Sequence, residues 1–175
     1  MHTLSPLAGN DFVTQDPTGI TFTGGYFLCG GRVRIVAPPS GVAAGLYFAG
    51  NQFVGTYCHF SGYSAFQADG AFTAVKDLTI VGTIAEPGIQ TRNSRATLSV
   101  TASTPTATFL FNFTDLLLFD AASIPLRTIT ASLVTDTDAQ KPVALVARSP
   151  QGGMVTVDAA APVTGTVTVT VDQSA

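Results

Sequence analysis

The sequence has little charge. Asp, Glu, Lys and Arg together make up 11% of its 175 residues, whereas a typical soluble domain has roughly 25%. Charge on a protein surface opposes association. This chain therefore either exposes a neutral surface of Thr, Ser, Asn and Gly or buries much of its surface against neighbouring subunits. We favour the second interpretation and expect a homo-oligomer.

Basic residues are few and scattered. Arg32 and Arg34 form one pair, Arg92 and Arg95 form another, and the formal net charge is −3. Nucleic-acid binding takes its affinity from clustered Lys and Arg on the phosphates. The chain has no such cluster and no basic N-terminal arm, so we expect no direct contact with nucleic acid.

Targeting signals are also missing. The first residues, MHTLSPLAGNDFVTQDP, contain neither the basic segment nor the apolar segment of a secretory signal. No run of about 18 apolar residues, the length that spans a bilayer, occurs in the chain. We expect synthesis in a cytoplasm without a signal peptide, and no membrane partner.

Cysteine is scarce, with only Cys29 and Cys58. Without a secretory signal we predict buried free thiols, although a disulfide between neighbouring strands is the alternative. Metal ligands are equally few, because Cys29, Cys58 and His59 do not make a full set and no CxxC or HxxxH spacing occurs. We predict no metal and no other cofactor.

Catalytic patterns are weak. Cys58 and His59 are adjacent, and neighbouring side chains on a strand point to opposite faces. His59, Ser61 and Asp69 lack the strand–turn–helix elbow that exposes a nucleophilic serine, and no phosphate-binding loop is present. We predict that the protein is not an enzyme.

The acidic residues suggest turns more than sites. Asp136 and Asp138 offer two oxygens to a calcium ion that needs six to eight ligands, so we predict that they cap a turn. Glu86 is the only glutamate, which disfavours a glycosidase pair. Asn112 begins a glycosylation sequon inside a predicted strand, and we treat that match as chance.

Strand patterns fill most of the chain. Apolar residues alternate with threonine at a period of two, turn residues recur about every ten residues, and no stretch has a helical period. We predict an all-β fold with little helix and eight to eleven strands. The expected architecture is an antiparallel β-sandwich or barrel, jelly-roll-like or immunoglobulin-like. Residues 1–18 are predicted as an extended arm and 19–175 as one domain, with a subdivision near 86–94 as the alternative. No repeat of fixed period is visible.

An aromatic stretch runs from Gly45 to Phe72, with glycine between most of its eight Phe and Tyr residues. Aromatic side chains bury large areas, so such a stretch is a core, a surface covered by another subunit, or a ligand platform. For a subunit contact or a ligand, the candidate residues are Tyr47, Tyr57 and Tyr63.

The whole chain resembles the β-rich structural proteins of tailed-phage virions, namely capsid cement or decoration proteins, minor capsid proteins and tail components. The resemblance lies in the start MHTLSPLAGNDF, the Gly/Ala/Thr-rich aromatic middle and the ending VTGTVTVTVDQSA. It implies a virion protein that is oligomeric, often trimeric in the decoration class, and that binds other virion proteins. The alternative is a carbohydrate-binding or adhesin-type module that uses the tyrosines.

Overall fold

The computed structural model describes residues 11–55, 62–135, 143–149 and 152–174. Within these ranges the chain forms thirteen strands and no helix, which confirms the predicted all-β class. The predicted number of eight to eleven strands is too low, because the solenoid coils contain several strands of only two to four residues. The chain divides into two compact units, Met1–Ser94 with Ser174–Ala175 (unit 1) and Arg95–Gln173 (unit 2). No helix that could cross a membrane is found in the part of the chain that was described.

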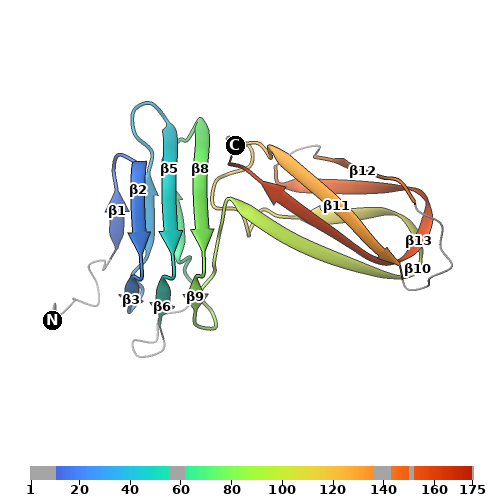
Figure 1. The fold of residues 1–175 in the computed structure, drawn as a ribbon, viewed down its shortest axis with the longest axis horizontal. Helices are drawn as coiled ribbons and strands as arrows, with labels where there is room; N and C mark the ends of the chain where they lie inside the picture. Colours follow the sequence, from blue (N-terminus) through green and yellow to red (C-terminus); the bar gives the residue numbers. More distant parts are fainter. Residues whose placement is uncertain (1–10, 56–61, 136–142, 150–151, 175) are drawn as a thin grey trace. The chain divides into compact units, whose positions relative to one another are not determined.

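Unit 1 is a parallel β-solenoid of three coils (Figure 1). Each coil contributes one strand to each of three sheets, so the strand orders are β1-β4-β7, β2-β5-β8 and β3-β6-β9, and every pairing is parallel. The strands are β1 Phe12–Thr14, β2 Thr18–Thr23, β3 Tyr26–Leu28, β4 Val33–Val36, β5 Val42–Ala49, β6 Gln52–Val54, β7 Phe66–Asp69, β8 Ala74–Val81 and β9 Ile84–Ala85.

The predicted antiparallel arrangement is therefore wrong for unit 1. Alternation of apolar and polar residues identifies a strand but does not say which way its partner runs. The coils also differ in length: Ile20 pairs with Leu46, 26 positions later, and Leu46 pairs with Leu78 after 32. Because the interval changes from coil to coil, the repeat is hidden from a search for a fixed period.

Phenylalanines fill the interior of the solenoid. Phe27 and Phe53 lie on neighbouring coils with their rings stacked at 4.7 Å between centroids. The ring of Phe66 meets those of Phe53 and Phe48 edge-on at 5.5 and 5.6 Å. The described phenylalanines of the aromatic stretch, including Phe72, are buried, so they form the core of unit 1.

Glycine makes the corner between the second and third sheets. Gly24, Gly50 and Gly82 stack on successive coils with φ of 66°, 63° and 62°, the left-handed region that other residues seldom adopt. The amide of Gly24 donates to the carbonyl oxygen of Ala49, and that of Gly50 to the carbonyl oxygen of Val81. The same turn is thus repeated at the same corner of each coil.

Unit 2 is antiparallel. Its strands are β10 Arg95–Asn112, β11 Thr128–Thr135, β12 Leu145–Arg148 and β13 Met154–Asp172. The long strand β13 pairs with the other three. The pairing of β10 with β13 shifts register between Ala102 and Thr108, next to Pro105, as expected where proline removes a ladder donor.

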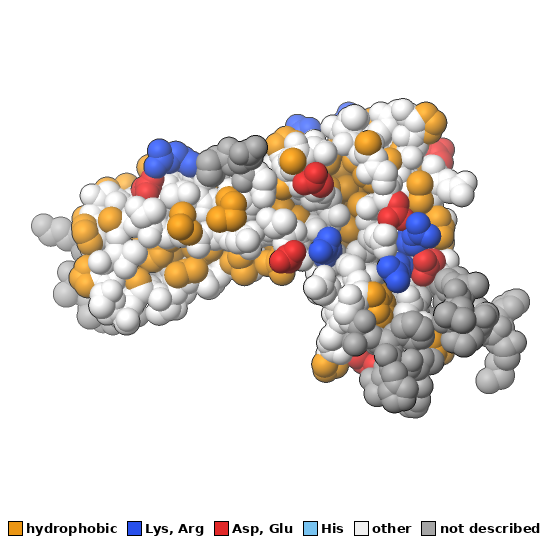
Figure 2. Space-filling view, turned by 180° about the vertical axis from the view of Figure 1, so that it is seen from behind, with side chains coloured by type: hydrophobic (Ala, Val, Ile, Leu, Met, Phe, Trp, Pro, Cys, Tyr) orange, Lys and Arg blue, Asp and Glu red, His pale blue; other side chains and the backbone are white. Residues whose placement is uncertain are grey.

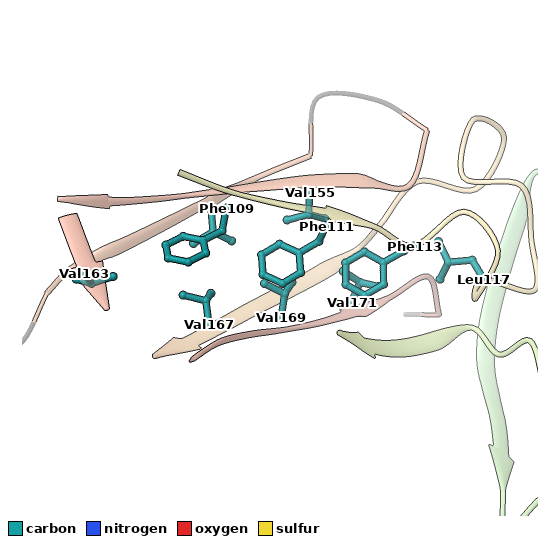
Figure 3. Packing of buried hydrophobic residues seen from close by; sticks show 10 residues of the cluster. Phe109, Phe111, Phe113, Leu117, Val155, Val163, Val167, Val169 and Val171 are labelled. Carbon is teal, nitrogen blue, oxygen red and sulfur yellow. The ribbon is translucent and has the colours of Figure 1, made fainter. Parts of the chain in front are cut away.

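One apolar cluster lies between the two parts of the β10–β13 pairing, before and after the register shift. Phe109 and Phe111 of β10, with Phe113 directly after the strand, project over Val167, Val169 and Val171 of β13 (Figure 3). All six side chains are buried. The alternation of valine with threonine in β13 therefore places the valines in this core and the threonines on the outer face.

Two further predictions concern the first coil. Of the predicted arm, residues 1–10 lie outside the described ranges, and Phe12–Thr14 forms β1. The predicted free thiols are wrong, because Cys29 is disulfide-bonded; the only other cysteine, Cys58, lies outside the described ranges. Parallel coiling places Cys29 beside the end of β6, where its amide donates to the Val54 carbonyl oxygen at 2.9 Å.

Candidate functional site

The predicted tyrosines do not form one platform. Tyr47 is 42% exposed on the outer face of β5, where the register places it between Thr21 and Thr79. Tyr63 lies beside Arg32, next to the first sheet, and Tyr57 lies outside the described ranges. Tyr47 is thus the described member of the set that is free to meet a ligand or a subunit.

Tyr63 is held in the wall of unit 1. The guanidinium of Arg32 lies over its ring, 5.5 Å from the centroid, which is within cation–π range. Its phenol oxygen is buried and makes no hydrogen bond of regular geometry. Burial raises the pKa of Tyr63, the charge of Arg32 opposes that rise, Glu86 adds to it, and a weaker contact with the Gly30 backbone lowers it. These contacts indicate a packed side chain and not an open binding residue.

Charged side chains on the outer face of the first sheet are partners of one another. Both Nε and Nη2 of Arg34 reach Oδ2 of Asp69 at 2.7 Å. Arg32 donates to Gln67 at 2.7 Å, and Gln67 donates to Oδ1 of Asp69 at 2.5 Å. Asp11 accepts from the Arg32 amide at 3.0 Å and lies 3.9 Å from both guanidinium groups.

This ladder joins side chains of neighbouring coils. The two arginines precede their partners by 35 residues, and only a parallel register places Arg34 beside Gln67. Arg32 and Arg34 alternate with Val33 and Ile35 in the sequence, which indicates an outward face, but nothing in the sequence shows that Gln67 and Asp69 lie beside them. Asp69 is taken up by this ladder; His59 and Ser61, its partners in the discounted triad, lie outside the described ranges.

Among the described residues, no strand covers the first-coil end of the solenoid. In the described part of the chain, β1, β2 and β3 each pair on one side only, with β4, β5 and β6. We call these three strand edges, with the inward side chains of Phe12, Ile20 and Phe22, the open end. The side chains of Phe12, Ile20 and Phe22 are only half-buried, whereas the side chains at the equivalent positions of the second coil are buried. The counterparts are Val33, Leu46 and Phe48.

Some polar groups at the open end have no partner among the described residues. Gly24 donates its amide to β5, and amide direction alternates along a strand, so the amides of Thr21 and Thr23 point away from β5. Thr14 is buried, and its hydroxyl has no hydrogen-bond partner. Unpaired main-chain groups on an edge are a template for another strand.

A second neutral surface covers the outer face of unit 2. Cross-strand hydroxyl pairs join β10 to β13 at 2.8–2.9 Å. Thr130 and Ser132 of β11 lie opposite β13 threonines on the same face. We call this array the hydroxyl face. The hydrogen-bonded pairs are Thr97–Thr170, Ser99–Thr168 and Thr101–Thr166.

Other polar residues of unit 2 have local partners. Asp158 accepts from Thr108 at 3.0 Å and is bonded by Arg148; the hydrogen bond from Thr108 and then that from Arg148 lower the pKa of Asp158. Asn112, the sequon residue, accepts from the Thr114 amide at 3.0 Å. Asp136 and Asp138 lie outside the described ranges.

In the portion that was described, no group of three or more His, Cys, Asp or Glu is placed to hold a metal ion. Comparison with known proteins finds no matching family model, no matching curated protein and no matching solved structure. The open end, the hydroxyl face and Tyr47 are therefore the surfaces from which a function has to be argued.

Proposed function

We propose that this chain is a non-enzymatic structural protein of a virus particle and that it stabilises a capsid or tail through contacts between subunits. One observation carries the proposal: the three strands at the first-coil end of the solenoid and the edge strand β11 of unit 2 have no charge, whereas the edge strands β7 and β8 at the other end of the solenoid contain Asp69, Lys76 and Asp77. None of β1, β2, β3 and β11 contains an Asp, Glu, Lys or Arg residue. Free-standing β proteins commonly protect their edges with such charges.

Uncharged strand edges suit a protein whose edges are buried against neighbouring subunits. An edge strand gives its main-chain donors and acceptors to a strand of a neighbour, and burial of the threonines and apolar side chains beside it desolvates no ion. Affinity then comes from main-chain hydrogen bonds and apolar area.

The distribution of charge over the surface supports the same proposal. Most of the face drawn in Figure 2 is white or orange, and blue side chains commonly adjoin red ones. The contacts of Arg34 with Asp69 and of Arg148 with Asp158 are examples of such pairing. Each charge of these pairs is matched within its own unit, so a neighbour that covers it meets little net charge.

Protein analysis of purified particles tests the proposal. Virus particles from the source of this chain are banded on a density gradient, treated with protease-free nuclease and analysed by quantitative mass spectrometry. We expect peptides of this chain to follow the particle band at a constant ratio to the main shell protein. Peptides found in the infected-cell lysate but depleted from the particle band contradict the proposal.

A second candidate function rests on two exposed aromatic side chains. Tyr47 is 42% and Tyr26 is 59% exposed on solenoid sheets, and aromatic faces on flat sheets can stack on sugar rings. If the chain is a carbohydrate-binding module, a glycan array gives a signal that Tyr47→Ala or Tyr26→Ala removes. Val81→Ala, which also alters an exposed position of unit 1, is the control and keeps the signal.

A further inference from the structure

We propose that the open end of unit 1 binds the open end of a second copy of this chain, with β2 of each copy paired antiparallel to β2 of the other. The inference rests on the proposed function and names one of its subunit contacts. A two-fold axis relates the copies, so the same residues meet on both sides.

The first argument is the contrast between coils. Leu46 and Phe48 of the second coil are buried at 1% and 0% exposure, while Ile20 and Phe22, which occupy the same stack positions, remain half-buried. The rings of Phe12 and Phe22 lie 4.4 Å apart at this end. A further layer of apolar side chains would bury them as the second coil buries its own.

The second argument is hydrogen-bonding capacity. The main-chain groups of Thr21 and Thr23 face away from β5, on the side where the described structure has no strand. An antiparallel copy of β2 supplies the matching donors and acceptors. The outward side chains at these positions are hydroxyls, which remain on the sheet surface when the edge is paired.

The inward side chains at the other end of the solenoid, by contrast, are covered by the chain itself. Residues after β9 fold over the third coil: Ile89 is buried, Gln90 bridges to Ser64, and Asn93 donates to the Ile80 carbonyl oxygen at 3.0 Å. The inward residues of that coil, such as Leu78, are buried. The strands β7, β8 and β9 also lack a second strand partner among the described residues, but the inward side chains there are already covered. Joining two copies at the first-coil end therefore gives a closed pair, whereas two complementary open ends would give a filament.

Charge does not oppose the pairing. The three edge strands contain no charged residue. Asp11, which precedes β1, lies within 3.9 Å of the guanidinium groups of Arg32 and Arg34. A second copy carries the same neutral strands, so the surface is compatible with itself.

The experiment combines sedimentation velocity with hydrogen–deuterium exchange on the full chain. Thr21→Pro removes the edge amide that the pairing requires and leaves the alternate amides that face β5. Thr21→Ala is the matched control, because it changes the same side chain and keeps the amide. We expect a dimer for the wild type and for Thr21→Ala, and at least a tenfold weaker association for Thr21→Pro. Peptides that cover residues 18–23 should become more protected as the protein concentration rises.

Hydrogen–deuterium exchange measured on the wild type tests the inference even if Thr21→Pro does not fold. Protection of residues 18–23 that is independent of concentration means that the chain covers its own edge, and it overturns the inference. An oligomer in which these residues exchange freely also overturns it, but leaves the proposed virion function standing. A monomer at all concentrations overturns the pairing, while the particle analysis decides the virion function separately.

Discussion

The side-chain amide of Gln173 donates hydrogen bonds to the carbonyl oxygens of Phe119 and Ile124, at 3.0 and 2.9 Å. Gln173 has no exposed surface, and its own Oε1 accepts from the Phe119 amide at 3.4 Å. The buried side chain of Gln173, which directly follows β13, thus binds the segment that connects β10 to β11.

Replacement of this glutamine by leucine should destabilise unit 2. Gln173→Leu keeps a similar volume but removes the donor that Gln173 supplies to two buried carbonyl oxygens, at about 1–3 kcal/mol for each group. We expect the free energy of unfolding, measured by urea titration, to fall by about 3 kcal/mol. Gln52→Leu, the same change at an exposed position, is the control. Equal losses for the two variants would contradict this role.

Gly165 lies where β13 passes β11. Its φ is 137°, and a Cβ atom would lie 2.3 Å from the Val134 carbonyl oxygen and 2.8 Å from the Thr135 Cα. Backbone atoms cannot move aside cheaply, so Gly165→Ala should cost about 3 kcal/mol or more. Gly152 also has a positive φ but meets nothing within 4 Å, so Gly152→Ala should cost only about 1 kcal/mol. Thermal unfolding of both variants checks the difference, and similar melting temperatures would refute it.

The strands were accessible from sequence, but their pairing in unit 1 was not. The alternation of Val33 and Ile35 with Arg32 and Arg34 predicts a strand, and β4 is there. The neighbour of a strand, however, is fixed by contacts far along the chain. Ile20, Leu46 and Leu78 form one stack, yet nothing local to any of them indicates a parallel partner.

The candidate surfaces were predictable to different degrees. Tyr47 lies outward because it alternates with Leu46 and Phe48, a pattern visible in the sequence. The open end was not visible, because Ile20 has the same apolar character as its buried counterpart Leu46. Its exposure depends on the number of coils on either side, which is a property of the whole unit.

Asn51 begins a stack of hydrogen-bonded groups along one corner of the solenoid, and the next coil does not extend this stack. Its side-chain oxygen accepts from the Gly25 amide at 2.9 Å, while its buried Nδ2 has no partner. The equivalent position one coil on is Thr83, whose hydroxyl is also buried without a partner. Thr83→Asn would put an amide oxygen beside Asn51, and we expect a gain of about 1 kcal/mol in the free energy of unfolding.

Thr79→Asn is the control for the stack. Thr79 lies on the exposed face of β8, where asparagine makes no stack and has a lower strand propensity. Denaturant unfolding should show a small loss for this variant and a gain for Thr83→Asn. A loss for both would mean that the corner has no room for a second asparagine.

Tyr63 should make stability depend on pH in the alkaline range. Burial raises its pKa in the folded chain above the ordinary value of 10.0, so the folded state keeps the phenol proton better than the unfolded state does. The resulting stabilisation is fully present below pH 10 and is lost as the pH rises through the raised pKa. We expect the free energy of unfolding to fall above pH 10 in the wild type and to fall less steeply in Tyr63→Phe. Urea titrations at closely spaced pH values measure both profiles, and parallel profiles would show that Tyr63 titrates alike in the two states.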